Sequence, residues 1–164
     1  MRTETHSIVR EGVIAGFLGA TAVAVWFFVV DLIAGRALFT PNALGEGFLS
    51  VFGRSPESRA VNVIAYTIFH YAAFTLVGII AVVLVHAGQR TASVLAGSMI
   101  LFVAIELGFY GLVALLRETA LGELAWYQIL AGNIVAAVVM GTYLWRSHPG
   151  VGSGLARALD GTAD

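Results

Sequence analysis

Three polar side chains interrupt long apolar stretches of this sequence. His70 lies in FHYAAFTLV, Glu106 lies in FVAIELGFYG, and Asn133 lies in a third apolar run. A carboxylic acid in apolar surroundings stays protonated unless a partner stabilises its charge, and an imidazole can be that partner. A buried His–Glu pair holds one proton in two states of similar energy, and the pair titrates as a unit. These residue types indicate a site that binds a proton or a small ligand.

The elements that must position these side chains are long apolar helices. The chain has 164 residues, of which 59% are apolar and only 12% are charged, and its mean hydropathy is +0.88. Soluble domains carry about 25% charged residues, so most of this chain is expected to lie in lipid. A span needs about 20 apolar residues, and the long stretches cover about 12–33, 61–85, 93–116 and 124–145. The sequence predicts an all-α fold, a four-helix transmembrane bundle formed by a single integral membrane domain over 1–164.

The depths of the three polar residues can be compared along their spans. Short connections predict that the last three spans run antiparallel to their neighbours. At 1.5 Å per residue, His70 lies about 5 Å from the middle of its span, and Glu106 and Asn133 lie about 3 Å from the middle of theirs. Alternating directions place all three on one side of the midplane, at nearly one level. We therefore expect Glu106 to meet His70, with Asn133 nearby.

Three further polar residues belong to the candidate site. Tyr66 precedes His70 by four residues and Tyr110 follows Glu106 by four, so each shares a helix face with its neighbour. Asp31 lies on the same side of the midplane, about 12 Å away from it. For Asp31 the alternative is a structural role, either as a helix cap or as the partner of a nearby arginine.

The whole cluster has two other interpretations. Polar contacts between membrane helices often stabilise a bundle only weakly, by about 0.6 kcal/mol each. Polar residues in a span can also contact another subunit. Both interpretations stay open beside proton or ligand binding.

The connection over residues 34–60 contains an amphipathic stretch, TPNALGEGFLSVFG. Thr40 is predicted to cap a helix that has Pro41 at its first position, and apolar side chains then recur on one face. We expect a short interfacial helix over about 41–53, between the first and second spans. The alternative is a re-entrant or ligand-covering flap. The glycine-rich tail over 149–164 is expected to be flexible.

Small residues predict close contacts between helices. Gly12 and Gly16 form a GxxxG pattern in the first span, followed by Gly19, and such a pattern lets two membrane helices approach closely. The last span offers Asn133 and Gly141 on one face. We expect these two faces to pack on each other within the chain. The alternative is a dimer seam on the first span, and hence a homo-oligomer.

Composition and spacing argue against several classes of function. The net charge of −1 does not suit a nucleic-acid partner, which basic proteins bind through its phosphates. The chain has no cysteine, and His70 with Glu106 would supply too few ligands for a metal. His70 and His86 lie about 24 Å apart along one helix and cannot both ligate one haem within a chain. With no nucleophile–base motif and no phosphate loop, the sequence predicts neither an enzyme nor a cofactor.

Three stretches are typical of a known kind of membrane protein: the span GVIAGFLGA, the loop with its amphipathic stretch, and the span containing FHYAAFTLVG. Through them the whole chain resembles small, functionally uncharacterised four-helix bacterial membrane proteins. Asn133 stands where a second histidine is expected in some of them. The resemblance implies a fold and no known activity, and it transfers no catalytic residue. The expected location is the bacterial inner membrane. The distribution of arginines favours cytoplasmic termini by a small margin.

Three functions are consistent with these features. The first is a small polytopic membrane protein, similar to a channel or transporter, whose His/Glu/Asn cluster binds a proton or small ligand. The second is an accessory or scaffold subunit of a larger membrane complex. The third is a redox subunit associated with haem or a quinone, in which His70, Tyr66 and Tyr110 hold a quinone carbonyl.

Replacing the intramembrane carboxylate tests the first of these functions. Glutamine has nearly the same shape as glutamate but exchanges no proton, so Glu106→Gln should leave expression and folding close to normal and abolish pH-dependent flux. The flux is measured in proteoliposomes under a pH gradient. An unchanged flux would contradict a transport role for Glu106.

Overall fold

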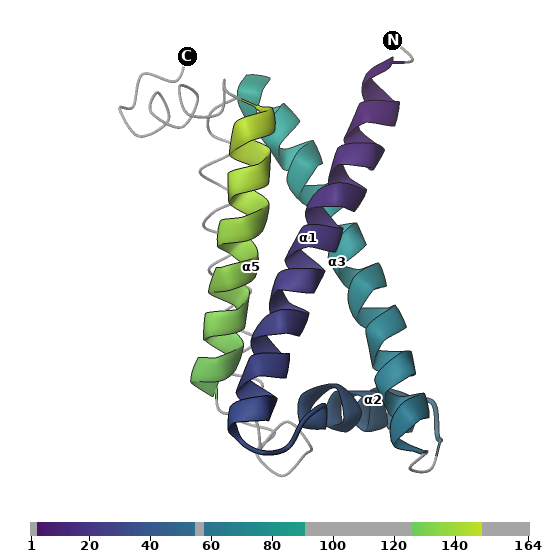
Figure 1. Cartoon of the computed structure of the whole chain (residues 1–164). Helices are drawn as coiled ribbons and strands as arrows, with labels where there is room; N and C mark the ends of the chain where they lie inside the picture. The colour runs from purple at the N-terminus through teal and green to yellow at the C-terminus, as the bar shows by residue number, and fades with distance from the viewer. Residues whose placement is uncertain (1–2, 55–57, 91–125, 149–164) are drawn as a thin grey trace.

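The computed structural model describes residues 3–54, 58–90 and 126–148 (Figure 1). The predicted span over 93–116 and the tail over 149–164 lie outside the described residues, and so do Glu106 and Tyr110. Within the described ranges the chain forms helices and no strand. The helices are α1 (Thr3–Ile33), α2 (Phe39–Val51), α3 (Arg59–Arg90) and α5 (Trp126–Ser147).

Three of these helices are long and apolar enough to cross a membrane. They cover Ile8–Ile33, Arg59–Gly88 and Trp126–Ser147. The helices predicted over 12–33, 61–85 and 124–145 are therefore confirmed, with slightly different bounds. A helix suits these segments because it satisfies every interior backbone N–H and C=O group without water.

Glycines end α1 and α2 in the same way. Gly35, after α1, has a φ of 68°, and its N–H bonds to the carbonyl of Leu32 at 3.0 Å. The next N–H, from Arg36, bonds to the carbonyl of Asp31 at 2.8 Å, which completes a Schellman motif. Gly53 ends α2 with a φ of 71°. A side chain is strained at such φ values, so glycine permits the sharp turn between α1 and α2.

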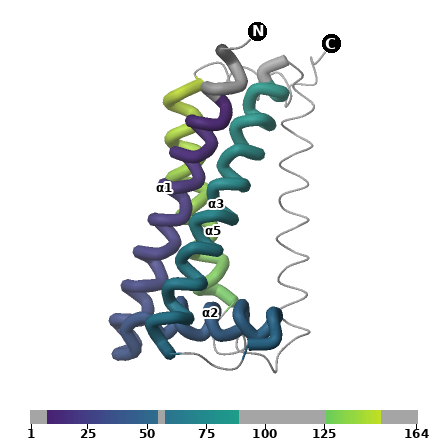
Figure 2. Tube along the Cα trace, turned by 90° about the vertical axis from the view of Figure 1, so that its right-hand side faces the viewer, coloured from purple at the N-terminus to yellow at the C-terminus, as the bar shows by residue number. Residues whose placement is uncertain are grey.

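The short helix α2 lies across the end of the bundle where α1 ends and α3 begins (Figure 1, Figure 2). It packs mainly on α3. Phe48 stacks on Phe69 with ring centroids 4.6 Å apart, and Gly45 lies against the backbone of Asn62. The helix predicted over 41–53 is thus present, but it begins and ends slightly earlier.

Thr40 does not cap α2, contrary to the prediction. The helix begins at Phe39, and its N-cap is Leu38, which has a left-handed φ of 61°. Thr40 lies in the first turn, where its N–H donates to Asp31 Oδ2 and its hydroxyl donates to Asp31 Oδ1, both at 2.8 Å. Asp31, at the end of α1, therefore supplies the oxygen that an N-cap side chain supplies in other helices, and it ties α2 to α1.

The helix α1 packs on both α3 and α5, and its contact with α3 is made by small residues. A Cβ added to Gly12 would lie 2.5 Å from the Cα of Ile79, and one added to Gly78 would lie 2.5 Å from the backbone nitrogen of Gly16. The first span thus makes the expected close contact within the chain, but its glycines mainly face α3. The expectation for Gly141 is wrong, because no described atom lies within 4 Å of its added Cβ.

The contact between α1 and α5 is looser and uses larger side chains. Met140 covers Gly19, and Ala136 is buried in a cluster with Phe27. The indole Nε1 of Trp26 donates to the backbone carbonyl of Gln128 on α5 at 2.9 Å. Because α1 contacts both long neighbours, it fixes where they stand relative to each other.

The outward faces of the long helices are apolar. Phe17, Ile68 and Val138 are 57%, 67% and 61% exposed, and many other large apolar side chains are similarly exposed. Soluble monomers rarely expose contiguous apolar surfaces of this extent, whereas lipid solvates them. These faces support assignment to the membrane proteins.

Two glycine-to-alanine variants test the contact between α1 and α3. Alanine at Gly16 would place its Cβ against the backbone carbonyl of Phe74, so Gly16→Ala should lower the free energy of unfolding by about 1–3 kcal/mol. The control is Gly141→Ala, where the new methyl group meets no described neighbour and the better helix propensity should raise stability by up to about 1 kcal/mol. Detergent-induced unfolding followed by circular dichroism measures both. Equal effects at the two positions would contradict the close contact.

Candidate functional site

His70 lies on α3, where it faces the backbone of α1. The side chain is buried, and its Nε2 is 3.1 Å from the carbonyl oxygen of Ala20. A carbonyl oxygen can only accept, so Nε2 carries a proton and donates it. In the neutral ring Nδ1 is then an acceptor, and the Tyr66 hydroxyl lies 3.4 Å from it. The small side chain of Ala20 lets the ring approach this closely.

A cavity of about 330 Å³ lies between α1, the start of α2 and α3. Its volume is at the lower end of the range of small-molecule sites, about 300–1,000 Å³. Most of its wall is apolar, with side chains such as Val25 and Phe28. The polar lining residues are Thr21, Thr40, Tyr66, Thr67, His70 and Tyr71. An apolar cavity with a few convergent polar groups is typical of a ligand site.

Four hydroxyl groups of this cavity already donate to acceptors of the protein. Thr67 and Thr21 each donate to the backbone carbonyl one turn earlier, at 2.7 and 2.8 Å. Thr40 donates to Asp31 at 2.8 Å. Thr21 uses its only proton in this way, so Tyr71 must be the donor in the 3.1 Å bond between their hydroxyls. These groups have no proton left for a ligand.

The pair formed by Tyr66 and His70 is different. The 3.4 Å between the Tyr66 oxygen and His70 Nδ1 exceeds the usual range for a hydroxyl donor, about 2.5–3.0 Å. A ligand carbonyl could accept the Tyr66 proton, and a ligand hydroxyl could donate to His70 Nδ1. Either contact would replace a weak hydrogen bond with a stronger one. The pair therefore provides both a donor and an acceptor at the wall of the cavity.

The structure brings together some of the residues predicted for the site. Tyr66 and His70 meet directly. Asp31 joins the region through its hydrogen bonds to α2, and this geometry suits the structural alternative considered for it. Glu106 and Tyr110 lie outside the described residues, so their meeting with His70 stays a prediction.

Asn133 lies on α5 and is not among the described residues that line the cavity. Its neighbour Gly132 faces Trp26, whereas His70 faces Ala20. These two positions on α1 are separated by about 9 Å at 1.5 Å per residue. The described contacts therefore do not bring Asn133 to His70.

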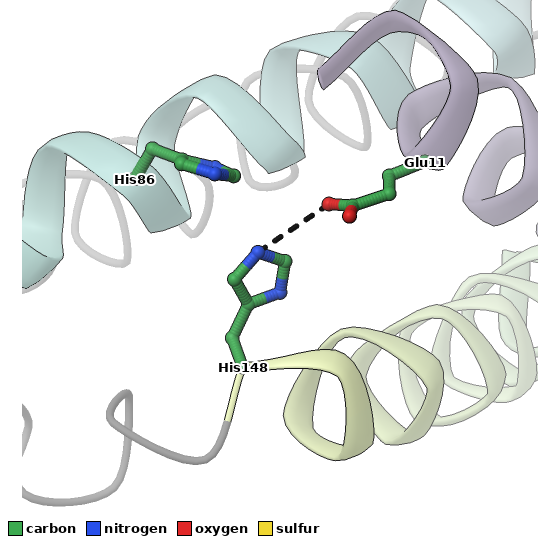
Figure 3. Close-up of side chains that lie close together, drawn as sticks. All are labelled: Glu11, His86 and His148. Carbon is green, nitrogen blue, oxygen red and sulfur yellow. Dashed lines mark ion pairs between the residues drawn. The ribbon is translucent and has the colours of Figure 1, made fainter. Parts of the chain in front are cut away.

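A second cluster, which the residue types and spacing alone do not predict, lies at the other end of the bundle. Glu11 of α1, His86 of α3 and His148 after α5 point toward one another (Figure 3), and one ligand atom from each lies within 4.8 Å of the others. The predicted topology contained a signal for it. The start of the first helix and the ends of the second and fourth were expected on one side of the membrane, and each carries one of these residues.

The fold defines a class: an all-helical protein with three helices long and apolar enough to cross a membrane, which is compatible with a multi-pass membrane protein. No protein-family model, curated protein or solved structure matches this chain.

Removing one acceptor oxygen tests whether Asp31 is structural. Asparagine keeps one acceptor for Thr40 but turns an NH₂ group toward the second donor, so Asp31→Asn should lower the free energy of unfolding by about 1–3 kcal/mol. Thr40→Val, which removes only the hydroxyl, should cost about 0.5–1.5 kcal/mol. Detergent-induced unfolding measures both variants. Wild-type stability in Asp31→Asn would contradict the structural role and favour a role in binding.

Proposed function

We propose that this chain is a small polytopic membrane protein that binds a small, mainly apolar molecule in the cavity beside His70. The observation that carries the proposal is the loosely bonded Tyr66–His70 pair in the wall of a largely apolar cavity of about 330 Å³. The ligand would bear one carbonyl or hydroxyl group, placed against this pair. The rest of the ligand would contact the apolar side chains of α1 and α3.

The chemistry of the pair favours a quinone-type head group among such ligands. A quinone carbonyl is an acceptor that suits the Tyr66 hydroxyl, and the reduced form has a hydroxyl that suits His70 Nδ1. The single pair could therefore bind both redox forms, with the phenolic oxygen as donor in one case and the imidazole as acceptor in the other. The apolar wall suits the ring and the first part of an aliphatic tail.

The same proposal includes a fourth span and a bacterial inner membrane location. His86 near the end of α3 and His148 after α5 lie in one cluster, so α3 and α5 end at the same end of the bundle. The end of α3 and the start of α5 therefore lie at opposite ends of the bundle. We propose that the apolar stretch over 93–116, which is long enough to span a bilayer, is the fourth span between them. In this arrangement α2 lies at the membrane surface, and the termini lie on the cytoplasmic side.

Removing one hydroxyl group tests the proposed ligand. The probe is a benzoquinone with a short aliphatic tail, and its affinity for the purified protein in mild detergent is measured by equilibrium dialysis. Tyr66→Phe keeps the shape of the cavity and removes the donor, so the affinity should fall by about 5–10-fold, the equivalent of one hydrogen bond. Tyr127→Phe is the matched control, because Tyr127 is exposed on α5 and does not line the cavity.

Two results would contradict this function. One is a wild-type protein that does not bind the quinone in detergent or in lipid nanodiscs. The other is an equal affinity in Tyr66→Phe, Tyr127→Phe and the wild type, which would show partitioning into detergent and no site. Solvent extraction of the freshly purified protein is an independent measurement, because a retained quinone would be recovered in the extract.

A further inference from the structure

We infer that Glu11, His86 and His148 form a binding site for one divalent transition-metal ion, of which Zn²⁺ is the reference case. The three residues come from three different helices and meet at the end of the bundle opposite α2 (Figure 1, Figure 3). One ligand atom from each lies within 4.8 Å of the others. This inference goes beyond the proposed function and does not depend on the cavity beside His70.

In both imidazole rings Nδ1 contacts a backbone carbonyl, which leaves Nε2 as the nitrogen that can bind a metal. His86 Nδ1 lies 2.9 Å from the carbonyl oxygen of Val82, and His148 Nδ1 lies 3.3 Å from that of Leu144. Carbonyl oxygens only accept, so each Nδ1 carries the proton and donates it. In the neutral rings each Nε2 then has a lone pair. Metal-binding histidines have the same arrangement, in which the second nitrogen donates to a carbonyl and fixes the ring.

The contact between His148 and Glu11 brings an imidazole nitrogen close to a carboxylate oxygen. His148 Nε2 lies 3.4 Å from Glu11 Oε2. With Nδ1 protonated, a neutral ring would point a lone pair at a carboxylate oxygen, and the two would repel. A cation between the two atoms would attract both of them. A metal ion suits this position, since metal ligands bind in their deprotonated forms.

The spacing of the ligand atoms suits a transition metal. Two ligand atoms at 2.0–2.2 Å from a tetrahedral zinc are about 3.3–3.6 Å apart, and the 3.4 Å between His148 Nε2 and Glu11 Oε2 falls in this range. The rings of His86 and His148 lie with centroids 4.8 Å apart and planes at 78°. Because the ligand atoms lie within 4.8 Å, a small rotation of side chains would bring His86 to the same ion.

The donor set selects the class of metal. Two imidazole nitrogens and one carboxylate oxygen suit Zn²⁺ and neighbouring first-row ions, whereas Ca²⁺ and Mg²⁺ prefer sites made of oxygen atoms. The side chain of His148 is only 9% exposed and that of Glu11 is 26% exposed, so the site is sheltered yet open to an entering ion. Three protein ligands leave a fourth position for water. A bound ion would join the ends of α1, α3 and α5.

Metal titration of purified variants tests this inference. The full chain, stripped with a chelator, is titrated with Zn²⁺ in competition with a chromophoric chelator, and the spectrum is recorded with Co²⁺. We expect one ion per chain, with visible Co²⁺ bands typical of tetrahedral coordination. His148→Ala and Glu11→Gln should each weaken Zn²⁺ binding by at least about 100-fold, since even residues that only orient metal ligands contribute 10–100-fold. Zn²⁺ should also raise the unfolding temperature of the wild type.

The control is Glu46→Gln, which makes the same chemical change on α2, at the other end of the bundle. This variant should bind Zn²⁺ with wild-type affinity and give the wild-type Co²⁺ spectrum. Circular dichroism and gel filtration show whether each variant is folded, and Glu11→Gln keeps nearly the shape of the native side chain. The inference is overturned if the folded wild type binds no Zn²⁺, or if Glu11→Gln and Glu46→Gln bind it equally well.

Discussion

The close approach of α1 and α3 at glycine is the contact on which the rest of the structure depends. Gly12 and Gly16 on α1 meet Gly78 on α3 with so little space that an added Cβ would clash with backbone atoms. Two helices that touch at this point separate from it on either side. Toward α2 they separate around the cavity beside His70, and α2 closes that end. Toward the opposite end, Glu11 and His86 lie beyond the glycines, and α5 brings His148 to them. One contact between small residues thus positions both candidate sites.

The helices could be predicted from the sequence, but their partners could not. Apolar runs of the length of a bilayer fix where helices form, and the glycines of the first span indicate a close contact. A pattern on one helix does not reveal which neighbour it faces. The sequence predicts that Gly141 packs on the glycines of the first span, but α3 makes that contact. Thr40 illustrates the same limit within a turn. Its type and position are those of a cap. Instead, the carboxylate of Asp31, brought close by the turn at Gly35, accepts hydrogen bonds from the N–H and the hydroxyl group of Thr40.

The candidate sites were predictable to different degrees for similar reasons. The pairing of Tyr66 with His70 follows from four-residue spacing on one helix, so a local rule was sufficient. The cavity depends on the angle at which α1 and α3 cross, and that angle cannot be predicted from the residue types. Glu11 and His148 lie near the ends of apolar spans, where charged and polar residues are common and attract little notice. Glu11, His86 and His148 are seen to converge only when the three helix ends that carry them are placed side by side. Finding this cluster therefore requires the topology of the helices as well as the residue types.

Three of the histidines follow one physical rule that connects the two sites. His70, His86 and His148 each use one ring nitrogen to donate to a backbone carbonyl, which fixes the tautomer and turns the other nitrogen into an acceptor. In an apolar environment such an acceptor is costly unless a donor or a cation faces it. At His70 the facing group is the Tyr66 hydroxyl, so the site suits a neutral ligand that exchanges hydrogen bonds. At His148 the facing group is the carboxylate of Glu11, so the pair suits a metal cation that both groups can bind. The same ring geometry therefore supports a site for a neutral molecule at one end of the bundle and a site for a cation at the other.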